Sequence, residues 1–262
     1  MQLGMPTLIQ HENLEEAGKL CRSLGLDFVE LNMNMPQYQI ENLEETKTFL
    51  DVADKYQIYY TIHLDENLDV CNFNHDVSKV WMDTVLRTIE VAKKLRVPIL
   101  NMHMNEGVHV TLPEQKVYLF EKYKEIYLEK LKIFRDMCQR EIAGRNILIS
   151  IENTDGYHLF QKEGIELLLE SKVFSLTWDI GHSYVSGKAD ELYILEHVKW
   201  LKHLHIHDAM NDKNHLTLGT GKMNLDEKLK IAEKYDCRCV LETKTEEALK
   251  QSMRWLKEWK KR

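Results

Sequence analysis

Eight short apolar runs, rich in β-branched and aromatic residues, recur along the chain and predict β-strands. They cover Gln2–Met5, Asp27–Leu31, Ile58–Leu64, Pro98–Met104, Asn146–Glu152, Phe174–Asp179, Leu201–His207 and Arg238–Glu242. Runs such as Ile147–Ile151 continue without polar alternation, which indicates strands that are buried on both faces, as in a parallel sheet.

Charged segments with helical periodicity separate these runs. They span residues 12–24, 42–56, 76–95, 113–142, 161–171, 188–198, 225–235 and 245–259. Three of these segments carry helix-start signals, namely Asn42 with Glu45, Pro113 with Glu114, and Asp226 with Glu227. The long segment 113–142 predicts a helical elaboration of the fourth strand–helix unit.

Eight strand–helix units within 262 residues predict an α/β protein with one closed (β/α)8 barrel, spanning residues 1–262 as a single domain. A doubly wound open sheet is the alternative. No GxGxxG motif and no GxxxxGK motif followed by Ser or Thr comes after the first predicted strand. The commonest reason to prefer the open sheet is therefore missing.

Composition and charge narrow the function classes. Hydrophobic residues make up 44% and charged residues 29% of the chain, which excludes collagen-like, disordered and disulfide-scaffold proteins. Five cysteines without a CxxC pair, no signal-like start and no long apolar stretch lead us to expect a cytoplasmic protein that spans no membrane. The formal net charge of −7 disfavours nucleic acids and anionic membranes as partners.

Seven predicted strands end in, or close to, a residue that can bind metal or move a proton. These residues are Glu30, His63, His103, Glu152, Asp179, His205 and Glu242. Because the carboxyl ends of barrel strands converge on one mouth, we expect the seven side chains to face a single pocket. Each has a blander explanation by itself, such as a helix cap for Asp179. A shared metal ion explains three converging carboxylates better, since each unpaired buried charge costs several kcal/mol.

Two sets of metal ligands are open at this point. Glu152, Asp179, His205 and Glu242 come from the last four strands and form an oxygen-rich set that suits Mn²⁺, Mg²⁺ or Co²⁺. Further nitrogen donors would suit a multinuclear Zn²⁺ site, namely His63, His103, His182 and His215.

Five short motifs together resemble the xylose isomerase-like barrel superfamily. They are Ser150–Thr154, Trp178–His182, His203–Asp208, Leu218–Gly221 and Leu241–Thr243. That superfamily contains sugar and sugar-phosphate isomerases and epimerases, and also the apurinic-site endonucleases. The resemblance implies a (β/α)8 barrel with a divalent metal ion at the C-terminal mouth.

Similarity to the ketose epimerases implies roles for individual residues. The implied metal ligands are Glu152, Asp179, His205 and Glu242. Glu152 and Glu242 would also be the acid–base pair, and His182 would hold a substrate hydroxyl. These epimerases place an arginine a few residues after the histidine ligand, where this chain has Ala209–Asp212. The identity of the substrate therefore does not carry over.

The endonuclease branch supplies an alternative interpretation. It uses histidines near the positions of His63, His103, His182 and His215, and its Glu-Asn-Thr-x-Gly stretch is similar to Glu152–Gly156. It also carries an aspartate two residues before the last histidine, where this chain has Lys213. The missing ligand argues against a full three-metal cluster.

Charge favours the isomerase. One divalent ion among three carboxylates leaves a net charge of 2 − 3 = −1, which a neutral sugar tolerates and which keeps a carboxylate base available. A phosphodiester would need two or three Zn²⁺ ions, and the acids Asp65, Glu66 and Asp69 would repel DNA. Lys213 and Lys222 could offset these acids and recognise a sugar phosphate.

We therefore expect a metal-dependent isomerase or epimerase of a sugar or sugar derivative, with a small sugar or sugar phosphate as its substrate. Its Glu152–Glu242 pair would move a proton through a metal-stabilised enediolate. A zinc phosphodiesterase of the apurinic endonuclease type is the first alternative, and a sugar-binding barrel without turnover is the second. A homo-oligomer stays open.

Overall fold

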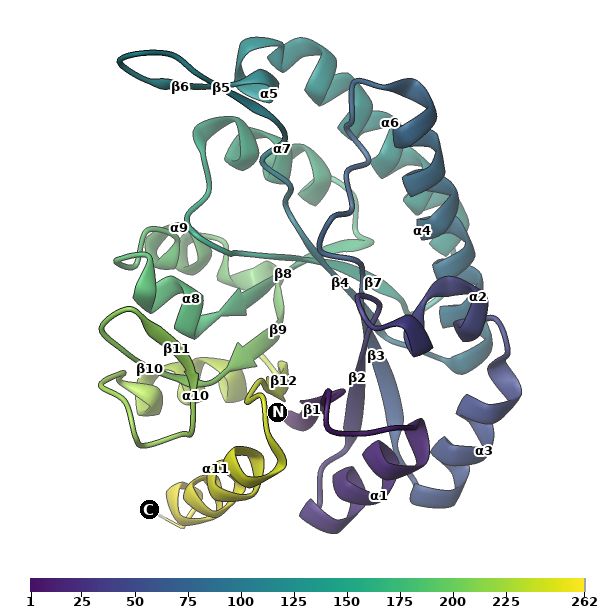
Figure 1. Cartoon of the computed structure of the whole chain (residues 1–262), viewed down its shortest axis with the longest axis vertical. Coiled ribbons are helices and arrows are strands. Elements are labelled where there is room, and N and C mark those ends of the chain that lie inside the picture. Colours follow the sequence, from purple (N-terminus) through teal and green to yellow (C-terminus); the bar gives the residue numbers. More distant parts are fainter. Residues whose placement is uncertain (262) are drawn as a thin grey trace.

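The eight predicted strands close into a parallel barrel in the computed structural model, which describes residues 1–261 (Figure 1). They are β1 (Gln2–Pro6), β2 (Phe28–Asn32), β3 (Tyr59–His63), β4 (Ile99–His103), β7 (Leu148–Glu152), β8 (Phe174–Asp179), β9 (Leu201–Ile206) and β12 (Arg238–Leu241). Neighbours in the barrel follow the order of the chain, and β12 closes it onto β1. The barrel prediction is confirmed, and the open-sheet alternative is wrong.

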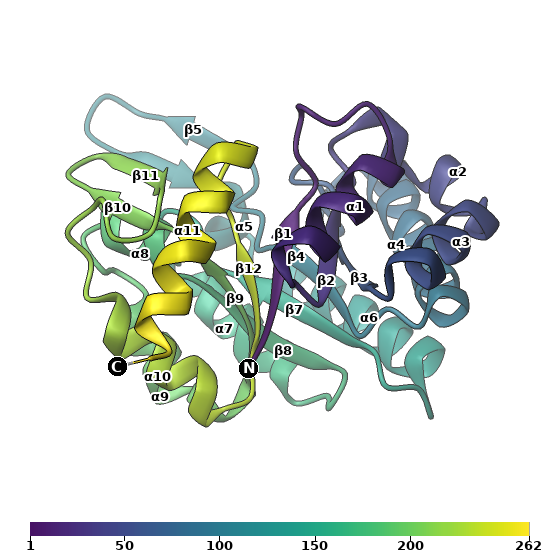
Figure 2. The same cartoon turned by 90° about the horizontal axis from the view of Figure 1, so that it is seen from below.

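Helices surround the strands, as the two views in Figures 1 and 2 show. The longer ones are α1 (Leu14–Leu24), α3 (Thr46–Tyr56), α4 (His75–Leu95), α6 (Lys124–Ile142), α7 (Leu159–Leu169), α10 (Leu225–Lys234) and α11 (Glu246–Trp259). Short helices are α2 (Ile40–Leu43), α5 (Leu119–Lys122), α8 (Ile180–Val185) and α9 (Glu191–Glu196), with 3₁₀ turns η1 (Pro36–Tyr38) and η2 (Val198–Trp200). None of the helices in the described part of the chain combines the length and apolar character needed to cross a membrane.

The predicted helix over 113–142 is wrong in its first part. Antiparallel strands β5 (His109–Thr111) and β6 (Lys116–Tyr118) form a hairpin there, and the helical structure begins at Leu119. Pro113 lies in the turn between the strands, where Leu112 N donates to Gln115 O at 2.8 Å. A proline with its fixed φ suits that turn as well as it suits a helix start, which explains the wrong prediction. The hairpin projects from the top of the molecule in Figure 1.

Two other helix boundaries also differ from the prediction. Asn42 does not cap the second helix; it lies in α2, and its side chain donates to Pro36 O at 2.8 Å. The segment 188–198 contains α9 and is preceded by α8, which ends at Val185, shortly before Gly187 and Lys188 adopt positive φ. The acidic start of α10 is confirmed, with Asn224 capping it.

The interior of the barrel is polar toward the C-terminal ends of the strands. Thr177 Oγ1 lies 2.6 Å from Asn101 Oδ1 and 2.7 Å from Ser150 Oγ, and all three side chains are buried. Thr61 on β3 similarly donates to Glu30 on β2 at 2.8 Å. These inward positions alternate with apolar ones that face the helices, so the strands carry a period-2 pattern after all. The polar interior forms the floor beneath the mouth.

Two short strands lie outside the barrel and border its mouth. They are β10 (Asp208–Met210) and β11 (Lys213–Leu216), which pair as an antiparallel hairpin directly after β9. The carboxylate of Asp208 accepts hydrogen bonds from the backbone of Gly219 at 3.0 Å and Gly221 at 2.8 Å. A Cβ atom at position 221 would lie 2.3 Å from Asp208 Oδ1, so this close approach requires glycine.

Candidate functional site

Four predicted ligands meet at the mouth of the barrel. Glu152 and Asp179 end β7 and β8, His205 lies on β9, and Glu242 directly follows β12. Nδ1 of His205 lies 2.8 Å from Glu152 Oε1, 3.2 Å from Glu242 Oε2 and 3.9 Å from Asp179 Oδ2. One donor atom from each of the four residues lies within 4.8 Å of the others. The convergence expected from strand-end positions is therefore present in the structure.

The electrostatics of this group call for a positive charge at its centre. Burial opposes ionisation of His205, but the carboxylates of Glu152, Glu30 and Glu242 outweigh it and raise the histidine pKa well above its usual value. Burial likewise opposes ionisation of Glu152, and the nearby His205 and His103 rings hold its pKa well below the usual range. In the metal-free protein, an imidazolium supplies the charge that three carboxylates need.

The donor chemistry fits a divalent cation. Both ring nitrogens of His205 are buried against carboxylates, with Nδ1 2.8 Å from Glu152 Oε1 and Nε2 2.8 Å from Glu30 Oε1. Nδ1 of His205 and one oxygen from each of the three carboxylates are close enough to one another that the group could hold a metal ion. Three oxygen donors and one imidazole suit Mn²⁺, Mg²⁺ or Co²⁺.

Asp179 serves as a helix cap and faces the site at the same time. Its Oδ1 accepts from the backbone N–H of His182 at 2.7 Å, which caps α8. The other oxygen, Oδ2, is the one that lies 3.9 Å from His205 Nδ1. Nε2 of His207 lies 3.0 Å from Oδ1 and 3.1 Å from Oδ2, and holds the carboxylate in place. Capping and ligation are therefore compatible, because a carboxylate has two oxygens.

His63 and His103 contact the carboxylate of Glu152 at the oxygen that does not face His205. Their Nε2 atoms lie 3.2 Å and 3.3 Å from Glu152 Oε2, and Asn101 donates to that oxygen as well. Nδ1 of His63 lies 2.7 Å from Leu64 O, which leaves Nε2 to face the carboxylate. Despite burial, Glu152 raises the pKa of His63 to about 9. His63, Glu152 and His205 form a second group that could hold a metal ion.

The remaining predicted residues lie on the rim next to β11. The rings of His182 and His215 are 5.5 Å apart, and His215 Nδ1 lies 3.9 Å from Glu242 Oε2. Burial lowers the pKa of His215 to about 4. Lys213 is exposed, and its side chain makes no hydrogen bond or ion pair with any described residue. His182 and His215 thus border the site, and Lys213 lies exposed on β11 beside them.

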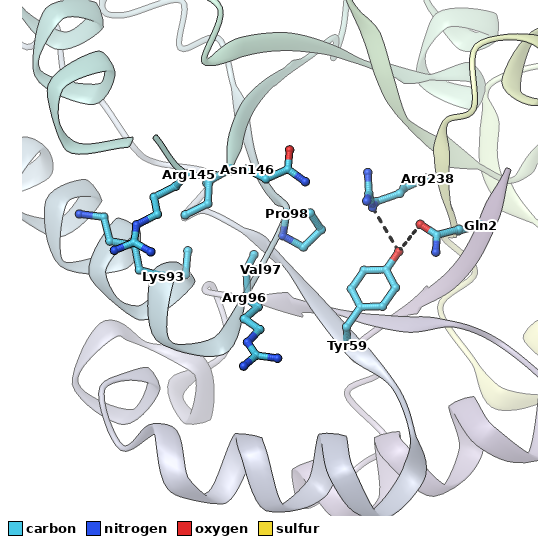
Figure 3. A pocket seen from close by; sticks show the side chains of 11 residues that line it. Gln2, Tyr59, Lys93, Arg96, Val97, Pro98, Arg145, Asn146 and Arg238 are labelled. Carbon is cyan, nitrogen blue, oxygen red and sulfur yellow. Dashed lines mark hydrogen bonds between the residues drawn. The ribbon is translucent and has the colours of Figure 1, made fainter. Parts of the chain in front are cut away.

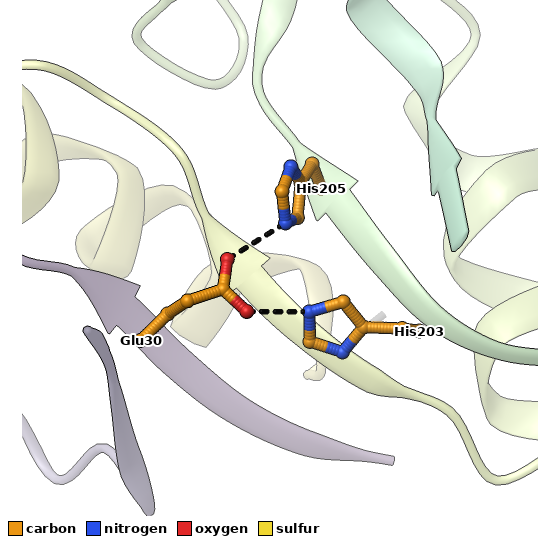
Figure 4. A group of neighbouring side chains, drawn as sticks. All are labelled: Glu30, His203 and His205. Carbon is orange, nitrogen blue, oxygen red and sulfur yellow. Dashed lines mark hydrogen bonds and ion pairs between the residues drawn. The ribbon is translucent and has the colours of Figure 1, made fainter. Parts of the chain in front are cut away.

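Glu30 lies one layer deeper than the mouth. Figure 4 shows its carboxylate between two histidines of β9, with His203 Nε2 at 2.9 Å from Oε2 and His205 Nε2 at 2.8 Å from Oε1. All three side chains are at most 3% exposed. Glu30 therefore contacts the ring of a proposed ligand from behind, and this places it away from the substrate side of the site.

Strand periodicity could have identified three functional neighbours that the sequence patterns above did not assign. His203 and Asn101 lie two residues before His205 and His103, and His207 lies two residues after His205. Inward-facing positions on a barrel strand recur every second residue. The alternation of His203, His205 and His207 therefore predicts three stacked layers on one strand.

Replacing Glu30 with Gln is expected to weaken metal binding by about 10–100-fold without unfolding the barrel. The carboxylate contacts Nε2 of His205 and so fixes which ring nitrogen faces the mouth, and loss of such an outer partner costs about this much affinity. Competition with a colorimetric chelator measures the affinity, and circular dichroism checks the fold. Unchanged affinity in a folded E30Q variant would show that Glu30 does not orient the ligand.

Comparison with known proteins places this barrel in a family. A model of the xylose isomerase-like TIM barrel matches residues 19–259. The chain belongs to that family. No protein with a curated description matches it in sequence. The resemblance inferred from the five motifs is thereby confirmed.

Solved structures with the same fold include sugar epimerases. A D-tagatose 3-epimerase-like protein superposes with a TM-score of 0.77 at 22% identity, covering 100% of this chain and 97% of its own. D-psicose 3-epimerase with D-tagatose from Clostridium cellulolyticum H10 gives 0.73 at 13% identity, covering 100% and 99%. The TTHB071 protein from Thermus thermophilus, soaked with ZnCl₂, gives 0.71 at 20% identity, covering 98% and 97%. At these identities the likeness establishes the fold alone.

Proposed function

We propose that this protein is a divalent-metal-dependent isomerase or epimerase of a sugar or sugar derivative. One observation carries the proposal, namely that three carboxylates and one imidazole from four neighbouring strands converge on a single point at the barrel mouth. Sugar epimerases among the proteins of the same fold support the choice of reaction class.

Glu152, Asp179, His205 and Glu242 would hold the ion. When bound, a divalent ion polarises a substrate carbonyl and its neighbouring hydroxyl, which acidifies the C–H bond beside the carbonyl. The protein's own part is to fix the donors and to keep two carboxylates available for proton transfer.

Each proposed acid–base carboxylate is anchored by one oxygen and presents the other to the centre. Glu152 is held through Oε2 by His63, His103 and Asn101, and its Oε1 faces His205. Lys244 Nζ binds Glu242 Oε1 at 2.7 Å, and Glu242 Oε2 faces His205. One carboxylate would remove a proton from carbon and the other would return it, and delivery to the opposite face of the carbon inverts that centre.

The rim offers hydrogen-bonding groups for substrate hydroxyls. The side chain of His182 is 29% exposed beside the site, and its Nε2 lies 3.5 Å from Asn214 Nδ2. We assign to His182 the binding of a substrate hydroxyl. The substrate class is a small sugar or sugar phosphate, in which case the unpartnered amine of Lys213 is available on β11 for a phosphate.

A zinc phosphodiesterase is the second candidate function, because His63 and His103 give Glu152 Oε2 a nitrogen-rich side. His63, Glu152 and His205 could hold a further ion, and these nitrogen donors would suit Zn²⁺. Lys213 counts against a third ion, since it replaces the aspartate that the apurinic endonucleases carry at this position.

Deuterium exchange tests the proposed reaction directly. Incubating metal-loaded protein with a panel of ketoses and aldoses in D₂O should place deuterium at one carbon beside the carbonyl, as read by NMR. Elemental analysis of untagged protein should find about one Mn, Mg or Co per chain. Cleavage of abasic DNA without any exchange, together with two Zn per chain, would instead establish the phosphodiesterase.

A further inference from the structure

A cavity lies at the end of the barrel opposite the candidate metal site (Figure 3). Its volume is about 460 Å³. Gln2, Tyr59 and Arg238 are the first residues of β1, β3 and β12, and Pro98 immediately precedes β4. Because the strands are parallel, their first residues gather at the N-terminal end of the barrel. The cavity is therefore separate from the mouth, and the proposed sugar chemistry gives it no role.

Four cationic side chains line this cavity, and no acidic side chain does. They are Lys93, Arg96, Arg145 and Arg238. Lys93 is neutralised by Glu90 at 2.5 Å and by Glu141 at 3.8 Å. Arg238 Nε lies 3.2 Å from the hydroxyl of Tyr59. The positive charge of Arg238 also contributes to lowering the pKa of the exposed Asp236 carboxyl group.

Arg96 and Arg145 are the unpaired members of this set. Both are exposed, and neither guanidinium makes a hydrogen bond or ion pair with any residue in the described range 1–261. Arg96 follows α4 with φ of 56°, and Arg145 lies in the loop after α6. Cations at helix C-termini are favoured by the helix dipole, which explains their presence but not their gathering around one cavity.

The remaining lining residues suit an organic group attached to an anion. Pro98 is partly exposed and provides apolar surface, with the buried Ala92, Val97 and Ile147 behind it, and Asn146 contributes an amide. Figure 3 shows Tyr59 and Arg238 on one side and Arg145 and Lys93 on the other, with Val97 and Pro98 between them. The volume lies within the range of about 300–1,000 Å³ that is typical of small-molecule sites.

We propose that this cavity binds an organic phosphate of the nucleoside monophosphate type. The planar guanidinium groups of Arg96 and Arg145 match phosphate oxygens in charge and geometry. The partly exposed Pro98 and Tyr59 would contact the organic group.

Calorimetry with adenosine monophosphate tests this proposal on the full metal-loaded chain. We expect saturable binding of AMP, weaker binding of inorganic phosphate and no binding of adenosine at equal ionic strength. The double variant R96Q/R145Q should weaken AMP binding at least 10-fold. The matched variant R254Q, which removes an exposed arginine from α11, should leave it unchanged. Both arginines of the double variant are exposed, so the fold should tolerate their loss.

Three results would overturn the proposal. AMP binding that R96Q/R145Q leaves intact would place the ligand elsewhere, including at the metal site. Equal affinity for AMP and inorganic phosphate would remove the role of the organic group. The absence of any binding at millimolar AMP would leave the cations as helix-end stabilisers only.

Discussion

Replacing Glu152 with Gln is expected to lower kcat for sugar epimerisation or isomerisation by at least about 10³-fold. The side chain is proposed both to bind the metal ion through the oxygen facing His205 and to transfer a proton. A positioned acid or base contributes about 10²–10⁴ to a rate, and loss of an anionic ligand adds to that cost. Gln keeps the size of the side chain but removes its charge and basicity.

Steady-state kinetics and deuterium exchange in D₂O measure this effect. The E242Q variant should show a loss of similar size, because both carboxylates are needed to move a proton to and from carbon. The matched variant E163Q removes an exposed carboxylate on α7 that pairs with Lys124, and it should retain full activity. Near-normal exchange in E152Q would eliminate Glu152 as acid or base.

Removing the metal ion is expected to lower the melting temperature by about 5–10 °C. An ion present at about 100 times its Kd adds roughly 2.7 kcal/mol to the free energy of unfolding. For a chain of this size, each kcal/mol shifts the midpoint by about 2–4 °C. The physical reason is that three carboxylates converge on one buried point, where a protonated His205 has to replace the lost divalent cation with a single charge.

Differential scanning calorimetry after chelation and dialysis measures the shift. Adding back Mn²⁺, Mg²⁺ or Co²⁺ should restore the midpoint, and Na⁺ at equal ionic strength should not. A D179N variant should lose most of this metal-dependent stabilisation. A midpoint that is indifferent to chelation and to added metal would contradict a metal ion at this site.

The arrangement of the site was predictable because barrel geometry leaves little freedom. A parallel barrel brings every strand end to one mouth, so Glu152, Asp179, His205 and Glu242 had to lie near one another once the strands were recognised. Short β-branched runs mark those strands clearly, and each lies within two residues of its expected bounds.

The depth at which a side chain lies along the barrel axis was not predictable, because it depends on strand register. Glu30 also lies near a strand end, yet it pairs with Thr61 rather than with His63, two residues further along β3. That offset sets Glu30 below the mouth and against His203. The sequence of a strand does not show which residue of the neighbouring strand each of its residues pairs with, since register is set by the packing of whole strands.

Local ambiguity explains the remaining errors. Pro113 with Glu114 satisfies the rules for a helix start and for a hairpin turn, and only pairing between β5 and β6 decides between them. Asp179 satisfies the rules for a helix cap and for a metal ligand; in the structure one oxygen caps α8 and the other lies 3.9 Å from Nδ1 of His205, so the two roles are compatible.

The most direct test is anomalous diffraction from crystals grown with Mn²⁺. The account predicts one strong peak at the C-terminal mouth, within about 2.4 Å of Nδ1 of His205 and of one oxygen from each of Glu152, Asp179 and Glu242. A map without that peak, with the carboxylates of Glu152 and Glu242 still paired to a protonated His205, would contradict the central claim.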